Sequence, residues 1–420
     1  MQYFETEFIK YKNNELYIED ISLNHIAAQH GTPVYVYSKN YFIKRYQEFE
    51  NAFENINHKI FYAMKSNFNL NVIKTFTDLG SGVDVNSEGE LYRALKTGIN
   101  TDKIIMSGVG KTSNEIKLAL EKKLLMIKAE CEEEVELINK IAGEMIVTAN
   151  VALRVNPDVD AKSHPYISTG LSNNKFGINV KSAVNIYKNR KKFEHINFTG
   201  IDMHIGSQIT FVEPFVEAVQ KLSAIYFELK SDGLKLEHFD VGGGIGVDYN
   251  NDKSFTITEF AERIIPLFNK LDCEIFFEPG RFLTANAGVL LTSVTYNKTN
   301  GNKKFIIVDS AMNDMLRPTI YQAYHHIQPV IKNDDRKNIH ADIVGPVCES
   351  GDYFAKDREI TEIKSGELLA IMSAGAYGMV MASNYNARRR APEIMIDGKE
   401  VSVVRNRETF EHLLWDEKVE

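Results

Sequence analysis

The chain has 420 residues, 44% of them hydrophobic and 25% charged, which is the balance of a globular protein rather than of a low-complexity chain. Its length predicts two domains or three, because one hydrophobic core seldom serves more than about 250–300 residues. The net charge of −8 argues against a general affinity for nucleic acid or anionic membranes.

The cysteines indicate a reducing compartment, and the apolar runs indicate that the chain does not span a membrane. Cys131, Cys273 and Cys348 form neither a disulfide framework nor a metal-ligand pattern, so we expect no bound metal. The first residues carry no signal-peptide pattern, and no apolar run approaches the roughly 18 residues of a membrane span. We therefore expect a cytoplasmic protein.

In chain order, a hairpin-like N-terminal segment, "FIKYKNNELYIEDI", precedes a repeating pattern over about residues 59–285. Short apolar runs alternate there with helix-period segments such as 87–97 and 113–122, and Ser87 with Glu90 has the spacing of a capping box. The runs are "KIFYAMK", "GVDV", "IIMSG", "LLMIKAE", "NVALRVN", "TGIDMHIGS", "FDVGGGI" and "EIFFEPG". Eight such units predict an α/β fold, a (β/α)8 TIM-type barrel over 37–285, with a doubly wound sheet as the alternative.

After about residue 286 the pattern becomes that of an all-β domain. Hairpins are expected to turn at Asn300-Gly301 and at Asp397-Gly398, with strand-like runs at 327–331, 341–347 and 368–372 between them. The N-terminal hairpin is expected to pair with this part. We therefore predict a discontinuous C-terminal all-β domain formed by residues 1–36 and 286–420.

Polar residues follow several barrel runs at their C-terminal ends, where barrel enzymes have their active sites. Lys65 ends the first run, so partial desolvation would free its amine for Schiff-base chemistry, although a lysine on the barrel rim is the simpler alternative. His204 and Ser207 end the sixth run, and a structural role for the histidine stays open.

The last two runs add an anion site and a carboxylate. The consecutive glycines of "VGGGIG", with Gly243 and Gly244, suit a phosphate cradle or a plain tight turn. Glu278 and Arg281 flank Pro279-Gly280 and suit a cofactor contact or an ordinary ion pair. In combination, an amine, a phosphate cradle, a ring-stacking histidine and a carboxylate match pyridoxal 5'-phosphate.

The sequence also resembles the barrel-type pyridoxal-phosphate decarboxylases of basic amino acids, specifically the diaminopimelate decarboxylase family. The resemblance spans nearly the whole chain and rests on ordered motifs: "YAMKSN", "GVDVNSEGE", "HIGSQI", "VGGGIG", "EPGRFL", "MNDMLRPTIYQAYH", "GPVCESGD" and "GAYGMVMASNYN". It implies decarboxylation of meso-2,6-diaminopimelate to L-lysine and CO2, the last step of lysine biosynthesis.

The resemblance also assigns roles to individual residues. Lys65 would bind the cofactor covalently, and Cys348 would return a proton to the substrate α-carbon. The cofactor contacts would be Lys65, Asp84, Arg154, His204, Ser207, Gly243, Gly244, Glu278, Pro279, Gly280, Arg281 and Tyr377. The substrate contacts would be Arg281, Arg317, Tyr321, Glu349 and Tyr377. The family forms homodimers in which the "CESGD" loop serves the neighbouring subunit.

Three alternatives stay open. Another decarboxylase of the same fold would act on carboxynorspermidine, ornithine or arginine, but "MNDMLRPTIYQAYH" together with "CESGD" favours diaminopimelate. An amino-acid racemase of the same barrel would pair the ring nitrogen with arginine, whereas Glu278 is available here. A non-catalytic pyridoxal-phosphate-binding or partner-binding relative would be expected to have lost Lys65 or the thiol loop.

Overall fold

The computed structural model describes residues 3–161, 169–170, 174–250 and 254–419, and the chain forms two compact units. The barrel unit comprises Arg45–Val247 and Lys253–Phe282, and the β-unit comprises Met1–Lys44, Asp248–Asp252 and Leu283–Glu420. Within the described ranges, no helix is both long and apolar enough to cross a membrane.

In the barrel unit, eight parallel strands close on themselves. Each strand pairs with the next along the chain, and the last pairs with the first, through Phe277 and Ile60. The strands are β5 (His58–Ala63), β6 (Gly82–Val85), β7 (Ile104–Met106), β8 (Met126–Ala129), β9 (Ala149–Asn156), β11 (Ile196–Asp202), β12 (His238–Asp240) and β13 (Glu274–Phe277), and β10 (Ile178–Asn179) extends β9. The predicted barrel is confirmed, and the doubly wound alternative is wrong.

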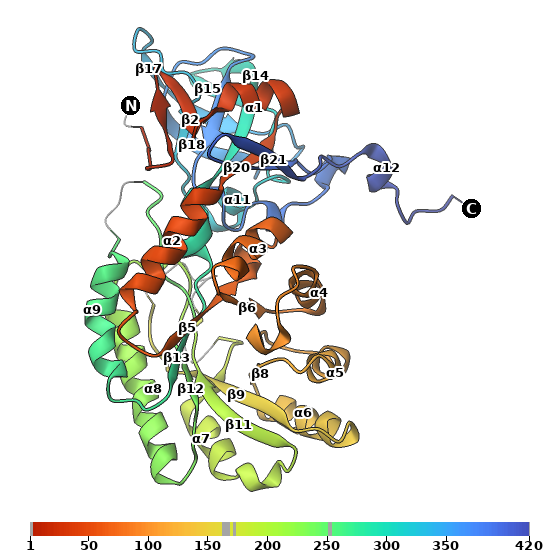
Figure 1. Cartoon of the computed structure of the whole chain (residues 1–420). Coiled ribbons are helices and arrows are strands. Elements are labelled where there is room, and N and C mark those ends of the chain that lie inside the picture. Colours follow the sequence, from red (N-terminus) through yellow and green to blue (C-terminus); the bar gives the residue numbers. More distant parts are fainter. Residues whose placement is uncertain (1–2, 162–168, 171–173, 251–253, 420) are drawn as a thin grey trace. The chain divides into compact units, whose positions relative to one another are not determined.

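Helices follow the strands and surround them, as Figure 1 shows for this unit. They are α2 (Lys39–Ala52), α3 (Leu70–Asp78), α4 (Glu88–Lys96), α5 (Ser113–Glu121), α6 (Glu132–Glu144), α7 (Val180–Lys188), α8 (Glu213–Ser231) and α9 (Ile257–Phe268), followed by the single turn α10 (Arg281–Thr284). The barrel interior is apolar at its centre, where Phe61, Ile105, Met126, Ala152 and Phe276 pack together.

The expected capping box of α4 is only half formed. Ser87 Oγ accepts a hydrogen bond from the backbone N–H of Glu90, as predicted. The Glu90 carboxylate, however, accepts from the backbone N–H of Asn86 instead of returning to Ser87. Burial raises the pKa of Glu90, and its side chain lies near the charges of Asp84 and Lys65.

The β-unit is built on one large sheet, with strands in the order β18, β17, β15, β14, β4, β20 and β21, and with β19 and β16 attached because β19 pairs with both β14 and β16. These strands are β4 (Val34–Ser38), β14 (Gly288–Asn300), β15 (Lys303–Val308), β17 (Asn338–Val344), β18 (Tyr353–Thr361), β20 (Glu393–Asp397) and β21 (Glu400–Arg405). The remaining elements are β1 (Ile9–Lys12), β2 (Glu15–Ile18), β3 (Ile21–Ser22), α1 (Leu23–His30), α11 (Arg317–Tyr321), β16 (Ile327–Pro329), β19 (Leu368–Ile371) and α12 (Phe410–Leu413).

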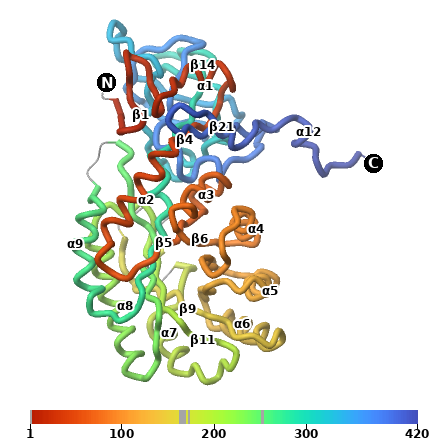
Figure 2. Tube along the Cα trace, viewed as in Figure 1, coloured from red at the N-terminus to blue at the C-terminus, as the bar shows by residue number. Residues whose placement is uncertain are grey.

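The N-terminal segment belongs to this unit because β4 lies inside its sheet. It pairs antiparallel with β14 and parallel with β20, and all its residues are buried. Figure 2 shows the red N-terminal trace beside the cyan and blue C-terminal trace within the unit. The first hairpin, β1–β2, forms its own small sheet with β3, and a single bridge joins Glu15 to Ile331.

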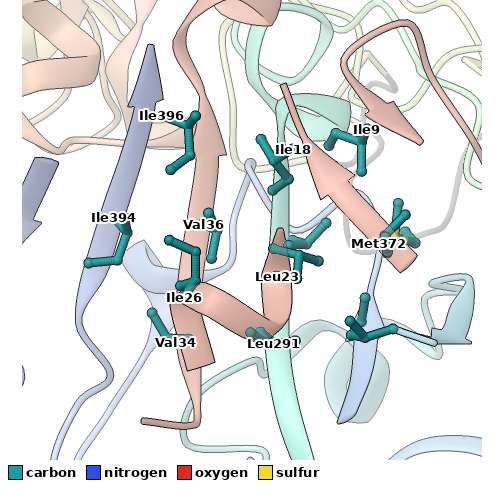
Figure 3. Packing of buried hydrophobic residues seen from close by; sticks show 14 of the residues in the cluster. Ile9, Ile18, Leu23, Ile26, Val34, Val36, Leu291, Met372, Ile394 and Ile396 are labelled. Carbon is teal, nitrogen blue, oxygen red and sulfur yellow. The ribbon is translucent and has the colours of Figure 1, made fainter. Parts of the chain in front are cut away.

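The core of the β-unit connects these segments through branched aliphatic side chains. Val34 and Val36 of β4 face Leu291 of β14, and Ile394 and Ile396 of β20 join them (Figure 3). Both predicted hairpins are confirmed: Asn300 pairs with Lys303, and Asp397 pairs with Glu400. The predicted all-β domain is therefore present and discontinuous in sequence.

A buried carboxyl group makes the stability of the β-unit depend on pH. Burial raises the pKa of Asp314 to about 7, although the backbone N–H of Ala311 donates to its Oδ2 over 2.9 Å. An unfolded aspartate has a pKa near 3.9, so the folded state binds this proton more tightly. The stability that protonated Asp314 contributes is fully present below about pH 4 and is lost as pH rises through about 7.

We expect Asp314→Asn to raise the melting temperature of the protein more at pH 8 than at pH 5, because a neutral amide does not pay the cost of ionising a buried group. Circular dichroism at the two pH values measures this difference. Asp335→Asn, which changes an exposed carboxylate of the same unit, is the control and should show no such pH dependence. Equal gains for Asp314→Asn at both pH values would contradict the prediction.

Candidate active site

The C-terminal ends of the barrel strands bring an amine and a carboxylate together. Lys65 lies in the helical turn η1 (Met64–Ser66) that follows β5, and its Nζ is 3.2 Å from Oδ2 of Asp84 on β6. Asp84 is fully buried, whereas the Lys65 side chain is 34% exposed. Burial opposes the charge of Asp84, but the ammonium groups of Lys65 and Lys128 outweigh it and lower its pKa. The lysine amine therefore lies beside a fixed anion, on a side chain that is partly exposed.

Two loops lie side by side after β11 and β12 and form a cradle of backbone groups. Ile209 N–H donates to the carbonyl of Gly244 over 3.0 Å, and Gly246 N–H donates to the carbonyl of Ile209 over 2.9 Å. A Cβ atom at Gly243 would lie 2.1 Å from the carbonyl oxygen of Glu278, and one at Gly244 would lie 2.3 Å from that of Gly206. Only glycine fits this close approach of three backbone segments.

A hydroxyl and a guanidinium group lie at the same cradle. Arg281, which begins α10, donates from Nη2 to Oγ of Ser207 over 2.9 Å. Before it, Pro279 accepts a hydrogen bond from Ala63 N–H over 3.2 Å, and Gly280 packs closely on Ala63. This turn therefore ties the end of β13 to the end of β5. The donors suit a phosphate group.

His204 presents a neutral ring. Gly243 N–H donates to its Nδ1 over 3.2 Å, so the proton of the neutral imidazole is on Nε2. Burial and then the positive charges of Arg154, Lys65 and Lys128 lower the pKa of His204 well below its ordinary value. An uncharged ring suits stacking on a flat aromatic ligand.

Arg154 is held by partners that the sequence did not indicate. Its Nη1 is 2.8 Å from Oε1 of Glu130, and the other oxygen of Glu130 accepts from Gly177 N–H over 2.9 Å. The guanidinium group lies 4.9 Å from the centroid of the Phe176 ring. The arginine is thus oriented before any ligand binds.

Glu278 belongs to a buried charge cluster that sequence reasoning missed. Lys128 on β8 contacts three carboxylates at once: Asp202 on β11, Asp240 on β12, and Glu278 directly after β13. All four residues are buried. The signal available was a charged residue inside the runs "LLMIKAE", "TGIDMHIGS" and "FDVGGGI". Among the site residues predicted within 45–282, hydrogen bonds join Lys65 to Asp84, His204 to Gly243 and Arg154, and Ser207 to Arg281.

The β-unit contains the other predicted residues, of which Arg317 at the start of α11 is buried. Its Nη1 is 2.7 Å from Nε2 of His325, and its guanidinium group lies 4.8 Å from the ring centroid of Tyr249. His325 Nδ1 lies 2.8 Å from the carbonyl oxygen of Met372, which can only accept. The histidine is thus protonated on Nδ1, and its Nε2 accepts from Arg317. Tyr321 and Tyr377 are half-buried in the same unit.

Cys348 and Glu349 lie on an exposed loop whose backbone is held by hydrogen bonds to Asp352. The carboxylate of Asp352 accepts from Met312 N–H and from Val347 N–H, each over 2.7 Å. A Cβ atom at Gly345 would lie 2.4 Å from the same carboxylate. The loop therefore presents its thiol and its glutamate on a fixed backbone.

Comparison with known proteins gives the family. The model of the pyridoxal-dependent decarboxylase, pyridoxal binding domain, matches residues 39–285. A diaminopimelate decarboxylase of Aquifex aeolicus is 44% identical over 408 residues, which cover 97% of this chain and 96% of that protein. The chain belongs to the diaminopimelate decarboxylase family of pyridoxal-dependent decarboxylases.

Other members of the family are similar in sequence and structure over nearly the whole chain. The Haemophilus influenzae enzyme is 44% identical over 97% of this chain and 98% of its own. The solved structure of the Helicobacter pylori enzyme complexed with L-lysine has a TM-score of 0.90 at 40% identity, covering 93% of this chain and 98% of that one. The M. jannaschii enzyme in co-complex with L-lysine has a TM-score of 0.94 at 36% identity, covering 99% and 98%.

The side chains present fit the cofactor of this family. Pyridoxal phosphate needs an amine for its aldehyde, donors for its phosphate and a partner for its ring nitrogen. Lys65 offers an amine on a partly exposed side chain, and the glycine cradle that a Cβ would fill lies beside Ser207 and Arg281. Among the described residues, Glu278 Oε1 contacts Lys128, while Oε2 receives no hydrogen bond.

A side chain placed in the glycine cradle should lower both the stability of the barrel and its affinity for the cofactor. We expect Gly243→Ala to lower the free energy of unfolding by about 1–3 kcal/mol, because the new methyl group would force the Glu278 backbone away. Urea unfolding measures this effect, and an absorbance titration with pyridoxal phosphate should show weaker binding. The control is Gly89→Ala in α4, whose nearest neighbour would be 3.9 Å away, and which should be neutral or stabilising. Equal stability of the two variants would contradict the prediction.

Proposed function

We propose that the chain catalyses the pyridoxal-phosphate-dependent decarboxylation of meso-2,6-diaminopimelate to L-lysine and CO2. One observation carries the proposal. The Lys65–Asp84 pair, the glycine cradle and Glu278 meet at one end of a barrel, in a chain whose relatives over nearly its full length are named diaminopimelate decarboxylase.

In this proposal the barrel unit holds the cofactor. Lys65 would bind the aldehyde carbon, and Ser207 with the backbone around Gly243 and Gly244 would hold the phosphate. His204 stacks on the ring, and Glu278 pairs with the ring nitrogen. The remaining contacts of this unit would be Asp84, Arg154, Pro279, Gly280 and Arg281, and Tyr377 of the β-unit would be a further contact. Bound pyridoxal phosphate supplies an electron sink for the electron pair left at the α-carbon when the carboxylate departs as CO2.

The chain's own residues then orient the substrate and move protons. Lys65 would hold the cofactor until substrate binds, with Asp84 as the fixed anion beside its amine. The thiol of Cys348 returns a proton to the α-carbon. Its position on a loop anchored by Asp352 supports this role, because a general acid must be held at a defined place.

Diaminopimelate has an amino-acid group at each end, so the distal end must be recognised. We assign its carboxylate to Arg281, Arg317 and Tyr321, and its ammonium to Glu349, with Tyr377 as a further contact. The orientation of Arg317 by His325 supports this assignment, since the guanidinium fork is fixed before binding. A substrate without the distal group would leave these polar side chains unpaired, which costs a large factor in kcat/KM.

The assembly and the compartment belong to the same proposal. We infer a cytoplasmic homodimer in which residues 37–285 bind the cofactor. Residues 1–36 and 286–420 would provide the substrate loop and the dimer contacts. Support for a shared site comes from the exposure of Cys348 and Glu349 on their loop. The described cysteines are all free, as expected in a reducing compartment.

The test is CO2 release from meso-diaminopimelate, L-lysine, ornithine, arginine and carboxynorspermidine at equal concentrations. We expect the kcat/KM for meso-diaminopimelate to exceed that for each other compound by at least about 10⁴-fold, the discrimination typical of a site built around a polar group. A preference for ornithine, arginine or carboxynorspermidine would establish the other decarboxylases of the fold instead. Bound cofactor without CO2 release from any compound would favour a non-catalytic protein.

The shared site predicts complementation between two inactive homodimers, Lys65→Ala and Cys348→Ala. A mixed dimer contains one site with both residues intact and one with neither. Random exchange therefore restores about a quarter of wild-type activity, because half the dimers gain one working site. Alone, Cys348→Ala should slow turnover by roughly 10²–10⁴-fold, the range for loss of a positioned acid.

Mass spectrometry of differently tagged subunits measures the exchange independently of activity. Mixing either variant with itself is the matched control, and it should give no gain. Complete exchange without restored activity would show that the thiol acts within its own chain or has no catalytic role.

A further inference from the structure

Glu278 is the acid assigned to the cofactor ring nitrogen. Among the described residues, only Lys128, which lies inside the barrel, places an ammonium group in contact with it. Lys128 is on β8, the fourth strand of the barrel, and Glu278 follows β13, the eighth, so the two lie on opposite walls. Nζ of Lys128 contacts Oε1 of Glu278. It also lies 2.8 Å from Oδ1 of Asp202 and 2.5 Å from Oδ2 of Asp240.

The ammonium occupies the centre of a carboxylate cluster that resembles a metal site. Asp202, Asp240 and Glu278 each offer an oxygen at a spacing that suits one ion. Lys128 fills that position, and its three N–H donors serve one carboxylate each. The cluster is therefore complete without a metal, and Lys128 fixes the direction of the Glu278 side chain.

The charges around Glu278 act in opposite directions. Burial and the nearby carboxylates of Asp84, Asp240 and Asp202 raise the pKa of Glu278 well above its ordinary value, and Lys128 alone among these groups acts to lower it. Burial also raises the pKa of Asp240 to about 6. Three carboxylates and one ammonium leave an excess of negative charge, so removal of Lys128 would favour a proton on Glu278.

We propose that Lys128 is a positioning residue that opposes protonation of Glu278 and orients it, so that Glu278 accepts a hydrogen bond from a protonated cofactor ring nitrogen. This inference rests on the proposed function and deepens it. Because Nζ contacts Oε1 directly, its charge acts more strongly on the carboxylate than on a ring bound beyond it. Without Lys128, the shared proton moves from the ring to Glu278, and the ring becomes a weaker electron sink.

The test measures the protonation of the ring directly. Full-length holoenzyme is reconstituted with pyridoxal phosphate labelled with ¹⁵N in its ring, and the nitrogen chemical shift is recorded by NMR. We expect a protonated nitrogen in the parent and an unprotonated one in Lys128→Met, with Glu278→Gln as the reference for an unprotonated ring. The kcat of Lys128→Met should fall at least tenfold, while KM should change less than threefold.

A second buried lysine is the matched control. Lys111 contacts Glu134 over 2.8 Å and also donates to the carbonyl oxygen of Lys128, but it does not reach the three-carboxylate cluster. We expect Lys111→Met to lower the melting temperature and to leave the ring nitrogen protonated. A purely structural role for Lys128 would give the same result in both variants.

A charge-matched double variant keeps the test decisive if Lys128→Met does not fold. Lys128→Met/Asp240→Asn removes one positive and one negative charge, so its cluster has the net charge of the parent. We expect it to fold and to retain the protonated ring. A protonated ring in Lys128→Met, or an unprotonated one in the double variant, would overturn the inference. A parent that binds no pyridoxal phosphate at all would instead overturn the proposed function.

Discussion

The arrangement of the barrel depends on one buried interaction, the contact of the Lys128 ammonium group with three carboxylates. Transfer of each of these ions from water costs several kcal/mol, while each contact near 3 Å returns about 5 kcal/mol at an effective dielectric constant of about 20. The balance is favourable only when every N–H finds an acceptor, as it does here. The cluster therefore contributes little net stability, but it holds strands four, six, seven and eight at one separation.

The closed barrel explains why this contact exists. Parallel strands end at the same side, and alternate strands send side chains into one layer of the interior. Asp84, Lys128 and Asp202 come from strands two, four and six, and Glu278 directly follows strand eight, so they share one buried layer, into which Asp240 of strand seven also reaches. In that space the protonation of each group depends on the others, because little water is present to screen them. The ionisation of Glu278 is thus a property of the whole layer.

Sequence patterns predicted the elements better than the contacts between them. Eight apolar runs indicated the barrel. In the β-unit, Asn300-Gly301 and Asp397-Gly398 indicated the two hairpin turns, because these residue pairs readily adopt the backbone conformation of tight hairpins. The partners of Lys128 could not be predicted, since an alternating pattern says which residues face inward but not which strands face each other. The capping box at Ser87 forms only in half for a related reason: the Glu90 carboxylate accepts from Asn86, in a buried environment that the local pattern does not contain.

The barrel unit and the β-unit share one feature: each functional group is oriented by a partner within the protein, before any ligand binds. His325 orients Arg317 because the carbonyl of Met372 fixes its tautomer, and Asp352 holds the Cys348 loop through two backbone N–H groups. Groups fixed in this way lose little entropy when a substrate arrives, so binding energy is available for the reacting atoms. These partners are histidine and aspartate within quoted motifs, and their roles follow only from the three-dimensional contacts, because spacing along the chain does not reveal what a buried side chain accepts or donates.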